Sequence, residues 1–302
     1  MKKLIESGLV VAAAAGIYVA AALAQGINFD AVEIKTHKVA GNVWMLEGAG
    51  GNIGVLVGDD GILLVDDQYA PLTQKIVAAV KKISDKPIRY LVNTHWHGDH
   101  TGGNENIGKM GVQIVAHDNV RTRLMTGQAT LLGKMEPQPK VALPVITFDN
   151  TVTYHINGET MHVYKVPPSH TDGDVFVRFK NAKVVHTGDV FAGYRYPYVD
   201  TINGGSAAGI LKAMDELIPT LDDDTKVIPG HGPISTKKDV IAYRNMMATV
   251  DARVAALVKQ GKNLQEVQAA NPTKDFEEIW GKVRKGEEFV RFLYYGHAPY
   301  KG

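Results

Sequence analysis

The six residues His95-Trp96-His97-Gly98-Asp99-His100 place four possible metal ligands in one short loop. The loop directly follows the apolar, strand-like run 88–94. Because alternate residues of an extended chain share a side, His95 and His97 can face one ion, and Asp99 and His100 fall toward a neighbouring position. Imidazole and carboxylate donors suit zinc, iron or manganese, and a site without thiolate is not typical of a purely structural zinc site. The loop therefore indicates a catalytic metal site.

Three more possible ligands follow short β-like runs later in the chain. His170 lies in a turn bounded by proline and glycine, and Asp189 ends the run Val185-His186-Thr187-Gly188-Asp189. His231 lies between two glycines, where the backbone can approach an ion closely. Since each donor comes just after a strand-like segment, the sequence predicts that one edge of a sheet gathers all seven side chains.

These motifs, with Asp66 in Leu64-Val65-Asp66-Asp67, resemble the metallo-β-lactamase superfamily in order and type over roughly residues 42–232. Five motifs in order are far more specific than one His-x-His pair. The resemblance implies a four-layered αββα sandwich of the α/β (α+β) class with a dinuclear metal site at one edge. It implies a structural role for Asp66 and one metal held by His95, His97 and His170. It assigns the second metal to Asp99, His100 and His231, with Asp189 contacting that metal or bridging both.

The departures from the family pattern concern the substrate. In the best-known zinc β-lactamases a cysteine stands where this chain has Asp189, and a lysine that grips the antibiotic carboxylate stands where it has Ala192. The Thr187-Gly188-Asp189 form resembles glyoxalase II and other hydrolases of the superfamily. Glyoxalase II has a basic C-terminal region for glutathione, and no clear equivalent follows Gly232. The resemblance therefore defines the chemistry better than the substrate.

Length and composition agree with one enzyme domain. With 302 residues, 45% of them hydrophobic, the chain can bury a substantial core, so residues 25–302 are expected to form one hydrolase domain. Its C-terminal part, about 236–302, carries apolar stripes at helical spacing and is expected to cover the core, with a substrate or oligomer role as the alternative. The absence of cysteine excludes disulfides and thiolate ligands.

The first 24 residues have the pattern of a signal peptide. Lys2 and Lys3 precede the apolar run 8–23, and Ala22-Leu23-Ala24 is a small-residue cleavage pattern, so cleavage is expected after Ala24. The expected location is periplasmic or secreted, without stable membrane association after cleavage; an uncleaved membrane anchor is the alternative. Without Lys2, Lys3 and Glu6 the 33 basic and 32 acidic residues become 31 of each. A neutral chain offers no electrostatic case for nucleic acid, and the sequence leaves the oligomeric state open.

Hydrophobic periodicity predicts the elements that carry the motifs. Strands are expected near 31–38, 43–47, 52–58, 61–65 and 88–94, and again near 151–156, 160–166, 174–179 and 182–187. Helices are expected over 71–83 and about 206–218, and the C-terminal stripes fall in 237–259 and 289–295. The two halves are thus similar in architecture, without a sequence repeat.

The segment 191–200 follows Asp189 closely and is rich in aromatic residues. It is interpreted as a substrate-pocket wall containing Tyr196, with Arg195 taking over carboxylate recognition, against the alternative of an ordinary packed loop. Tyr69 is expected at the mouth of the cleft, and Trp96 is expected to pack. The remaining histidines are expected to be surface or satisfied core residues: His37, His117, His155, His162, His186 and His297.

The ligand set predicts hydrolysis of a small-molecule substrate. Two Zn²⁺ ions roughly 3.5–4 Å apart can share a water and lower its pKa toward neutrality, so that a metal-bound hydroxide attacks an amide- or ester-type carbonyl. Asp99 would orient the hydroxide, and iron or manganese could replace zinc. A β-lactam is the leading substrate, and lactones and thioesters also fit.

Two other classes remain as alternatives. One is a mononuclear iron oxygenase similar to persulfide dioxygenases, which would use His95, His170 and Asp189. The other is a degenerate binding protein, which the intact ligand set disfavours. The metal content of the purified protein distinguishes the first alternative from the hydrolase, since one iron supports oxygenation and two zincs support hydrolysis.

Overall fold

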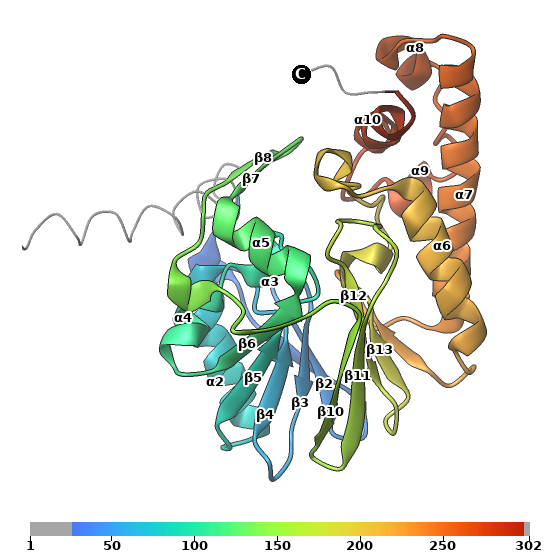
Figure 1. Ribbon diagram of the computed structural model, residues 1–302. Helices are drawn as coiled ribbons and strands as arrows, with labels where there is room; N and C mark the ends of the chain where they lie inside the picture. The colour runs from blue at the N-terminus through green and yellow to red at the C-terminus, as the bar shows by residue number, and fades with distance from the viewer. Residues whose placement is uncertain (1–25, 299–302) are drawn as a thin grey trace, which may run out of the picture.

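Two β-sheets face each other in the computed structural model, which describes residues 26–298, and helices cover their outer sides (Figure 1). The first sheet has the order β1-β2-β3-β4-β5-β6-β9. Its strands β1 to β4 form an antiparallel meander, and β5, β6 and β9 are added parallel to β4. The bounds are Lys35–Ala40, Val43–Glu47, Ile53–Leu56, Ile62–Val65, Ile88–Val92, Gln113–His117 and Ile146–Phe148.

The second sheet has the order β10-β11-β12-β13-β14. Its first four strands pair antiparallel, and β14 is parallel to β13. The bounds are Thr151–Ile156, Glu159–Lys165, Val175–Phe179, Val184–His186 and Lys226–Ile228. A separate hairpin, β7 (Gln128–Thr130) and β8 (Gly133–Met135), stands above the edge where the strands of both sheets end (Figure 1).

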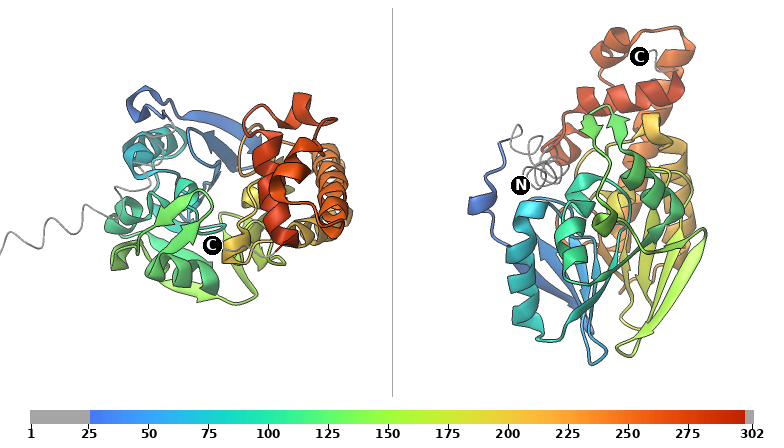
Figure 2. Two further views of the ribbon diagram at one scale, coloured as in Figure 1. Left: turned by 90° about the horizontal axis from the view of Figure 1, so that it is seen from above. Right: turned by 60° about the vertical axis from the view of Figure 1, so that its left-hand side comes forward.

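Helices connect the parallel strands and form the outer layers. Parallel neighbours need a crossover, and α2 makes it between β4 and β5. In Figure 2 the C-terminal helices gather on the side of the second sheet, away from the N-terminal half. The helices are α2 (Thr73–Ile83), α3 (Gly98–Thr101), α4 (Asn104–Lys109), α5 (Asp118–Thr126), α6 (Ala207–Leu217), α7 (Lys237–Lys259), α8 (Leu264–Ala269), α9 (Glu277–Trp280) and α10 (Gly286–His297).

Three hydrophobic clusters fill the spaces between the four layers. Val65 and Val92 of the first sheet meet Val163 and Val177 of the second in the central cluster. A second cluster joins the outer side of the first sheet to α2 and α4, and a third joins the second sheet to α6, α7 and α10. The predicted αββα sandwich is therefore confirmed.

One edge of the sandwich collects the carboxyl ends of the strands that carry the motifs. In the first sheet β5 ends there, and in the second sheet β11, β13 and β14 run in one direction. Hydrogen bonds join the two halves at this edge: Val175 N donates to Thr94 O at 3.0 Å, and Asn52 N donates to Gly230 O at 2.7 Å. The sequence predicts that the edge of one sheet holds all seven ligands, whereas in the structure the ligands follow strands of both sheets.

Other differences from the expected elements are local. The first strand begins at Lys35 because Phe29–Ala31 forms a 3-10 helix that packs Phe29 into the core. No element was predicted between residues 104 and 148, where the structure has α4, β6, α5, the hairpin and β9. The expected signal peptide, 1–24, lies outside the described residues. Within residues 26–298 no helix is both long and apolar enough to cross a membrane.

Candidate metal centre

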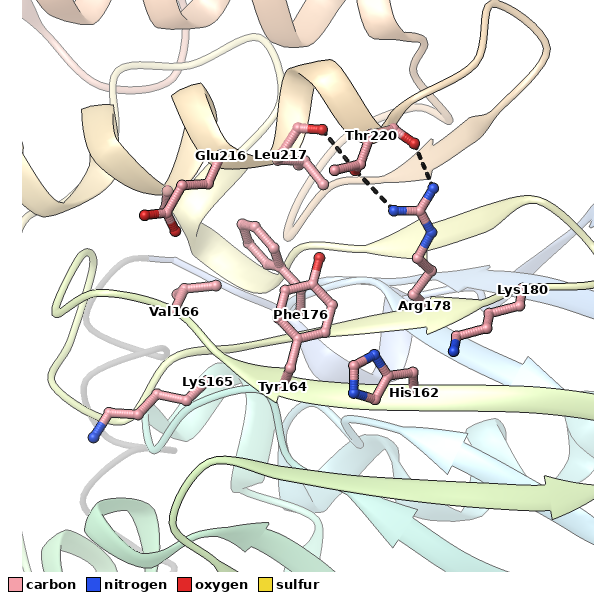
Figure 3. Close-up of a pocket in the computed structure, with 11 residues that line it drawn as sticks. His162, Tyr164, Lys165, Val166, Phe176, Arg178, Lys180, Glu216, Leu217 and Thr220 are labelled. Atoms are coloured by element: carbon pink, nitrogen blue, oxygen red, sulfur yellow. Dashed lines mark hydrogen bonds between the residues drawn. The ribbon is translucent and has the colours of Figure 1, made fainter.

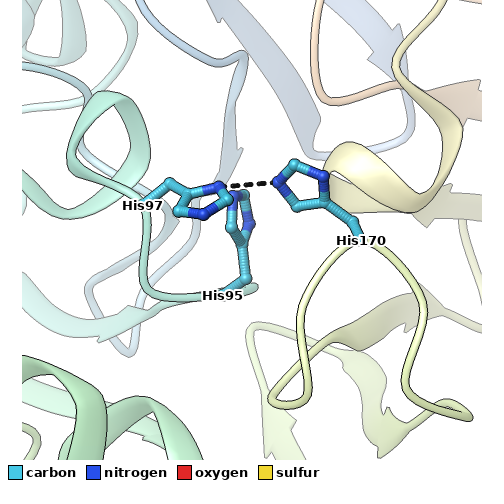
Figure 4. Close-up of side chains that lie close together, drawn as sticks. All are labelled: His95, His97 and His170. Carbon is cyan, nitrogen blue, oxygen red and sulfur yellow. Dashed lines mark hydrogen bonds between the residues drawn. The ribbon is translucent and has the colours of Figure 1, made fainter. Parts of the chain in front are cut away.

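All seven predicted ligands meet at this edge, in three overlapping groups. In each group one donor atom per residue lies within 4.8 Å of the others. Figure 4 shows the first group, in which His95 and His97 come from the loop after β5 and His170 from the loop after β11. The groups are His95, His97 and His170; His95, His100 and Asp189; and Asp99, His100 and His231. Because consecutive groups share His95 or His100, the seven side chains form one continuous cluster of possible ligands.

The loop from His95 to His100 is held by the buried carboxylate of Asp66. Its oxygens accept from Thr94 N at 2.8 Å and Thr94 Oγ1 at 2.7 Å, and the second oxygen lies 2.8 Å from His100 Nδ1. Asp66 adopts a positive φ of 66°, which Asp and Asn tolerate better than most residues. Asp66 thus orients the ring of His100 from behind, in agreement with the structural role that the resemblance implied.

The outer nitrogens of His170 and His97 are occupied by oxygen acceptors. His170 Nδ1 lies 2.7 Å from Tyr198 O, and His97 Nε2 lies 3.1 Å from Asp200 Oδ2. If these outer nitrogens donate, the inner ones carry lone pairs, yet His97 Nδ1 and His170 Nε2 are 2.7 Å apart (Figure 4). Two lone pairs at that distance repel each other unless a cation lies near both. This geometry fits a metal ion.

Buried polar atoms in the centre also lack hydrogen-bond partners among the described residues. They are His95 Nε2, His100 Nε2 and Asp189 Oδ1. His100 Nε2 is 3.1 Å from Asp189 Oδ1, but the two groups are not aligned for a hydrogen bond. Because native proteins rarely leave buried polar atoms unpaired, the donor set fits one or two divalent cations.

The charge states of His95, His170 and Asp189 suit metal binding. Burial and neighbouring imidazoles lower the pKa of His95 well below its usual value, and burial and His97 lower that of His170 to about 4. Both rings are therefore neutral near pH 7, as metal ligands must be. Burial opposes ionisation of Asp189, but the charges of His231 and His100 outweigh it and hold its pKa well below the usual range.

Two glycines let the backbone pass directly behind ligand side chains. A Cβ at Gly51 would lie 2.1 Å from the ring of His100, and a Cβ at Gly230 would lie 1.9 Å from Asp189 Oδ1. Any larger residue at either position would displace a ligand. The sequence predicted that the glycine backbone beside His231 lies close to an ion. In the structure, Gly230 lies close to the carboxylate of Asp189.

Asp200 is a site residue that the sequence analysis did not identify. It is fully buried and accepts from His97, from Asn203 Nδ2 at 2.9 and 3.0 Å and from the hydroxyl of Tyr198 at 3.1 Å. A carboxylate behind a metal-binding histidine fixes the ring orientation and raises its basicity. No spacing signal marks it, because it lies in an irregular loop eleven residues after Asp189.

A cavity of about 370 Å³ opens beside the cluster. Asp99, the most exposed ligand of the third group with a side chain 25% exposed, lies on its wall. Arg195 and Tyr69 also line it, at the positions expected for substrate contacts. The remaining wall comes from the β7–β8 hairpin and the α9–α10 connection, including Leu132, Lys134, Val283 and Arg284.

Tyr196 does not contact this cavity, so its assignment as a substrate residue is corrected. Its ring is fully buried and stacks on Phe289 of α10 at 4.9 Å between centroids. Its hydroxyl donates to Thr273 O at 3.3 Å. Arg195 lines the cavity, whereas its neighbour Tyr196 packs against the C-terminal helices. Trp96 is fully buried, as expected.

A larger cavity, about 530 Å³, lies on the outer face of the second sheet beside α6 (Figure 3). It carries Lys165, Arg178 and Lys180, and Arg178 donates to Thr220 through two nitrogens. His162 and Glu216 also line it, without a group of three possible ligands among the described residues. The smaller cavity is therefore the candidate active site.

The fold and the ligand cluster define an αββα sandwich with a candidate metal centre at the edge that its two sheets share. The chain belongs to the metallo-beta-lactamase superfamily, whose family model matches residues 46–231.

Three comparisons illustrate the similarity. The probable metallo-hydrolase YqgX of Bacillus subtilis (strain 168) is 29% identical over 201 residues, which cover 63% of this chain and 90% of the relative. A hydroxyacylglutathione hydrolase of Anaeromyxobacter dehalogenans (strain 2CP-C) is 28% identical over 196 residues, 61% of this chain and 67% of the relative. The solved metallo-beta-lactamase from Pontibacter korlensis matches with a TM-score of 0.60 at 19% identity, over 72% of this chain and 99% of that one, which shows the shared fold.

Proposed function

We propose that this hydrolase of the superfamily binds two Zn²⁺ ions and attacks an amide- or ester-type carbonyl, with a β-lactam as the first substrate to test. The observation that carries the proposal is the geometry of Asp189. Its oxygens lie 3.7 Å from His170 Nε2 in one group and 3.1 and 3.3 Å from His100 and His231 Nε2 in the other. A carboxylate between two sets of imidazoles fits a pair of cations that share a ligand.

The residues of the chain have distinct parts in this chemistry. Two cations held there would lower the pKa of a shared water and polarise a carbonyl. Asp99, on the cavity wall and 3.3 Å from His231 Nε2, is placed to accept a proton from a water in the cavity and to orient it. Asp66 and Asp200 keep the rings of His100 and His97 in position. Arg195 is placed to hold an anionic part of the substrate.

Thioester hydrolysis is the second candidate. The hydroxyacylglutathione hydrolase relative supports it, as does the aspartate at position 189. A mononuclear iron oxygenase would hold one metal with His95, His170 and Asp189, and it would leave Asp99, His100 and His231 without a metal.

A hydrolysis screen of the zinc-loaded chain tests the proposal. We expect two zinc ions per chain by elemental analysis and turnover of one class among β-lactams, lactones and thioesters. A single iron per chain with oxygen consumption would exclude the dinuclear hydrolase, and a preference for thioesters would replace the β-lactam assignment.

His231→Ala should reduce the bound zinc from two ions toward one, because His231 belongs to the third group alone, with Asp99 and His100. Metal titration followed by mass spectrometry under native conditions measures the change. His297→Ala is a matched control, since His297 lies in α10, belongs to none of the three ligand groups and pairs with Asp251 at 2.7 Å. Two ions bound by His231→Ala with unchanged affinity would contradict this division of ligands.

Export is also proposed, on the basis of the positive, apolar and small-residue pattern of residues 1–24. Mass spectrometry of the protein from its native host should show a chain that starts at Gln25. An intact Met1 in the cytosolic fraction would contradict export.

A further inference from the structure

The C-terminal helices contribute to the candidate active site as well as to the core. Val283 and Arg284, in the connection between α9 and α10, line the cavity beside the ligands. They lie more than fifty residues beyond the end of the family match at residue 231. The sequence predicts core cover for this region, and no clear equivalent of the basic glutathione-binding region of glyoxalase II follows Gly232. The structure shows that the region covers the core and also supplies a cation to the cavity.

The guanidinium of Arg195, on the same cavity wall, has no hydrogen bond or ion pair with any residue in 26–298, whereas its backbone N–H donates to Gly193 O at 2.9 Å. The residue is partly buried; burial and the charge of Arg284 lower its pKa, and the charges of Asp189 and Asp99 oppose this shift. A half-buried guanidinium has five N–H donors in a fixed fork, which matches a carboxylate. Arg195 is therefore available to a ligand.

Arg284 is held rigidly at the same wall. Its Nη1 donates to Tyr196 O at 3.0 Å, and its Nε lies 3.5 Å from Glu288 Oε1. The guanidinium also lies 5.9 Å from the ring of Tyr198 and 5.4 Å from that of Phe292. Since these contacts fix the side chain before a ligand arrives, little conformational entropy is lost on binding.

Exposed apolar residues lie on two sides of the same cavity. Leu132, at the tip of the β7–β8 hairpin, is 46% exposed, and Val283 of the α9–α10 connection is 65% exposed. Figure 2 shows the hairpin standing beside the C-terminal helices. Apolar side chains that stay exposed at the mouth of a polar cavity are typical of a binding surface.

We propose that Arg195 and Arg284 form a subsite for a carboxylate of the substrate, and that Leu132 and Val283 contact an apolar chain next to it. The substrate class is thus a carboxylate-bearing ester, thioester or amide with an apolar part, and the scissile carbonyl lies toward the metal ligands. This inference rests on the proposed hydrolase function for its kinetic consequence. The binding of the carboxylate itself does not require turnover.

Binding of hexanoate to the full chain as purified, measured by calorimetry, tests the subsite directly. We expect Arg284→Gln and Arg195→Gln each to weaken hexanoate about tenfold, because each removes one guanidinium. Lys282→Gln is the matched control, since Lys282 is exposed, lies two residues from Arg284 and carries the same charge outside the cavity. Leu132→Ser should weaken hexanoate more than acetate. Unchanged hexanoate affinity in both arginine variants would place the carboxylate on the metals and overturn the proposal.

A pair of esters tests the consequence for catalysis. For mono-4-nitrophenyl succinate we expect Arg284→Gln to raise KM about tenfold with little change in kcat, and for neutral 4-nitrophenyl butyrate we expect no change. Arg284→Lys should recover part of the KM. An equal loss for both esters would contradict a carboxylate subsite. If the chain hydrolyses no ester, lactone, thioester or β-lactam, and hexanoate binding still depends on Arg284, the proposed function fails and the subsite stands.

Discussion

Replacement of Asp189 by alanine should lower turnover about 100-fold or more and reduce the bound zinc toward one ion per chain. The reason is its position between the two ligand groups, 3.1 Å from His100 Nε2 and 3.7 Å from His170 Nε2. No other carboxylate of the described residues approaches both groups in this way. Steady-state kinetics together with elemental analysis of the variant measures both effects.

The control for this prediction is Asp189→Cys. In excess zinc it should retain more activity than alanine, because thiolate is a good zinc ligand, although it cannot bridge as a carboxylate does. Both variants should fold, since Asp189 is not part of any of the hydrophobic clusters. If Asp189→Ala keeps two metals and near-normal turnover, the ligands of the second metal must be assigned again.

Asp66→Ala should destabilise the sandwich by about 3–5 kcal/mol, since it leaves buried hydrogen-bonding groups without their acceptor. The groups are Thr94 N, Thr94 Oγ1 and His100 Nδ1, all within 2.8 Å of the carboxylate. Asp66→Asn should cost less, about 1–3 kcal/mol, because an amide keeps one acceptor and tolerates the positive φ. Urea denaturation monitored by circular dichroism measures the free energy of unfolding.

The matched control is Asp59→Ala, which removes a carboxylate whose side chain is fully exposed. Its effect should stay within about 0.5 kcal/mol. A cost for Asp66→Ala no larger than that of the control would show that Asp66 does not support the histidine loop.

The sandwich, and the clustering of the seven proposed ligands, can be predicted from the sequence because both depend on local patterns. β4 and β13 are short and fully buried, and the first ligand after β5, β11, β13 and β14 lies within five residues of the strand end, so the loop chemistry is visible in the sequence. The segment 104–148 lacks such patterns. There β7 and β8 have three residues each and are largely exposed, and β9 places Ile146 on the surface, so packing rather than periodicity defines these strands.

Contacts between distant segments explain the errors at the site. Tyr196 and Arg195 are adjacent in an irregular loop, and which side chain faces the cavity depends on Phe289, more than ninety residues later. Arg284 reaches the cavity because α7 to α10 fold back over the second sheet. Neither position has a spacing signal that relates it to the histidine loop.

The division of ligands between the two sheets links metal supply to folding. His97 follows the first sheet and His170 the second, 73 residues apart, so an ion bound by both cross-links the halves of the chain. A ligand that binds the folded state alone adds about 2.7 kcal/mol of stability when its free concentration is 100 times its dissociation constant. The resistance of this sandwich to heat or protease would then vary with the free zinc around it. Where zinc is scarce, loss of the ion would have two consequences at once: a weaker contact between the sheets and loss of activity.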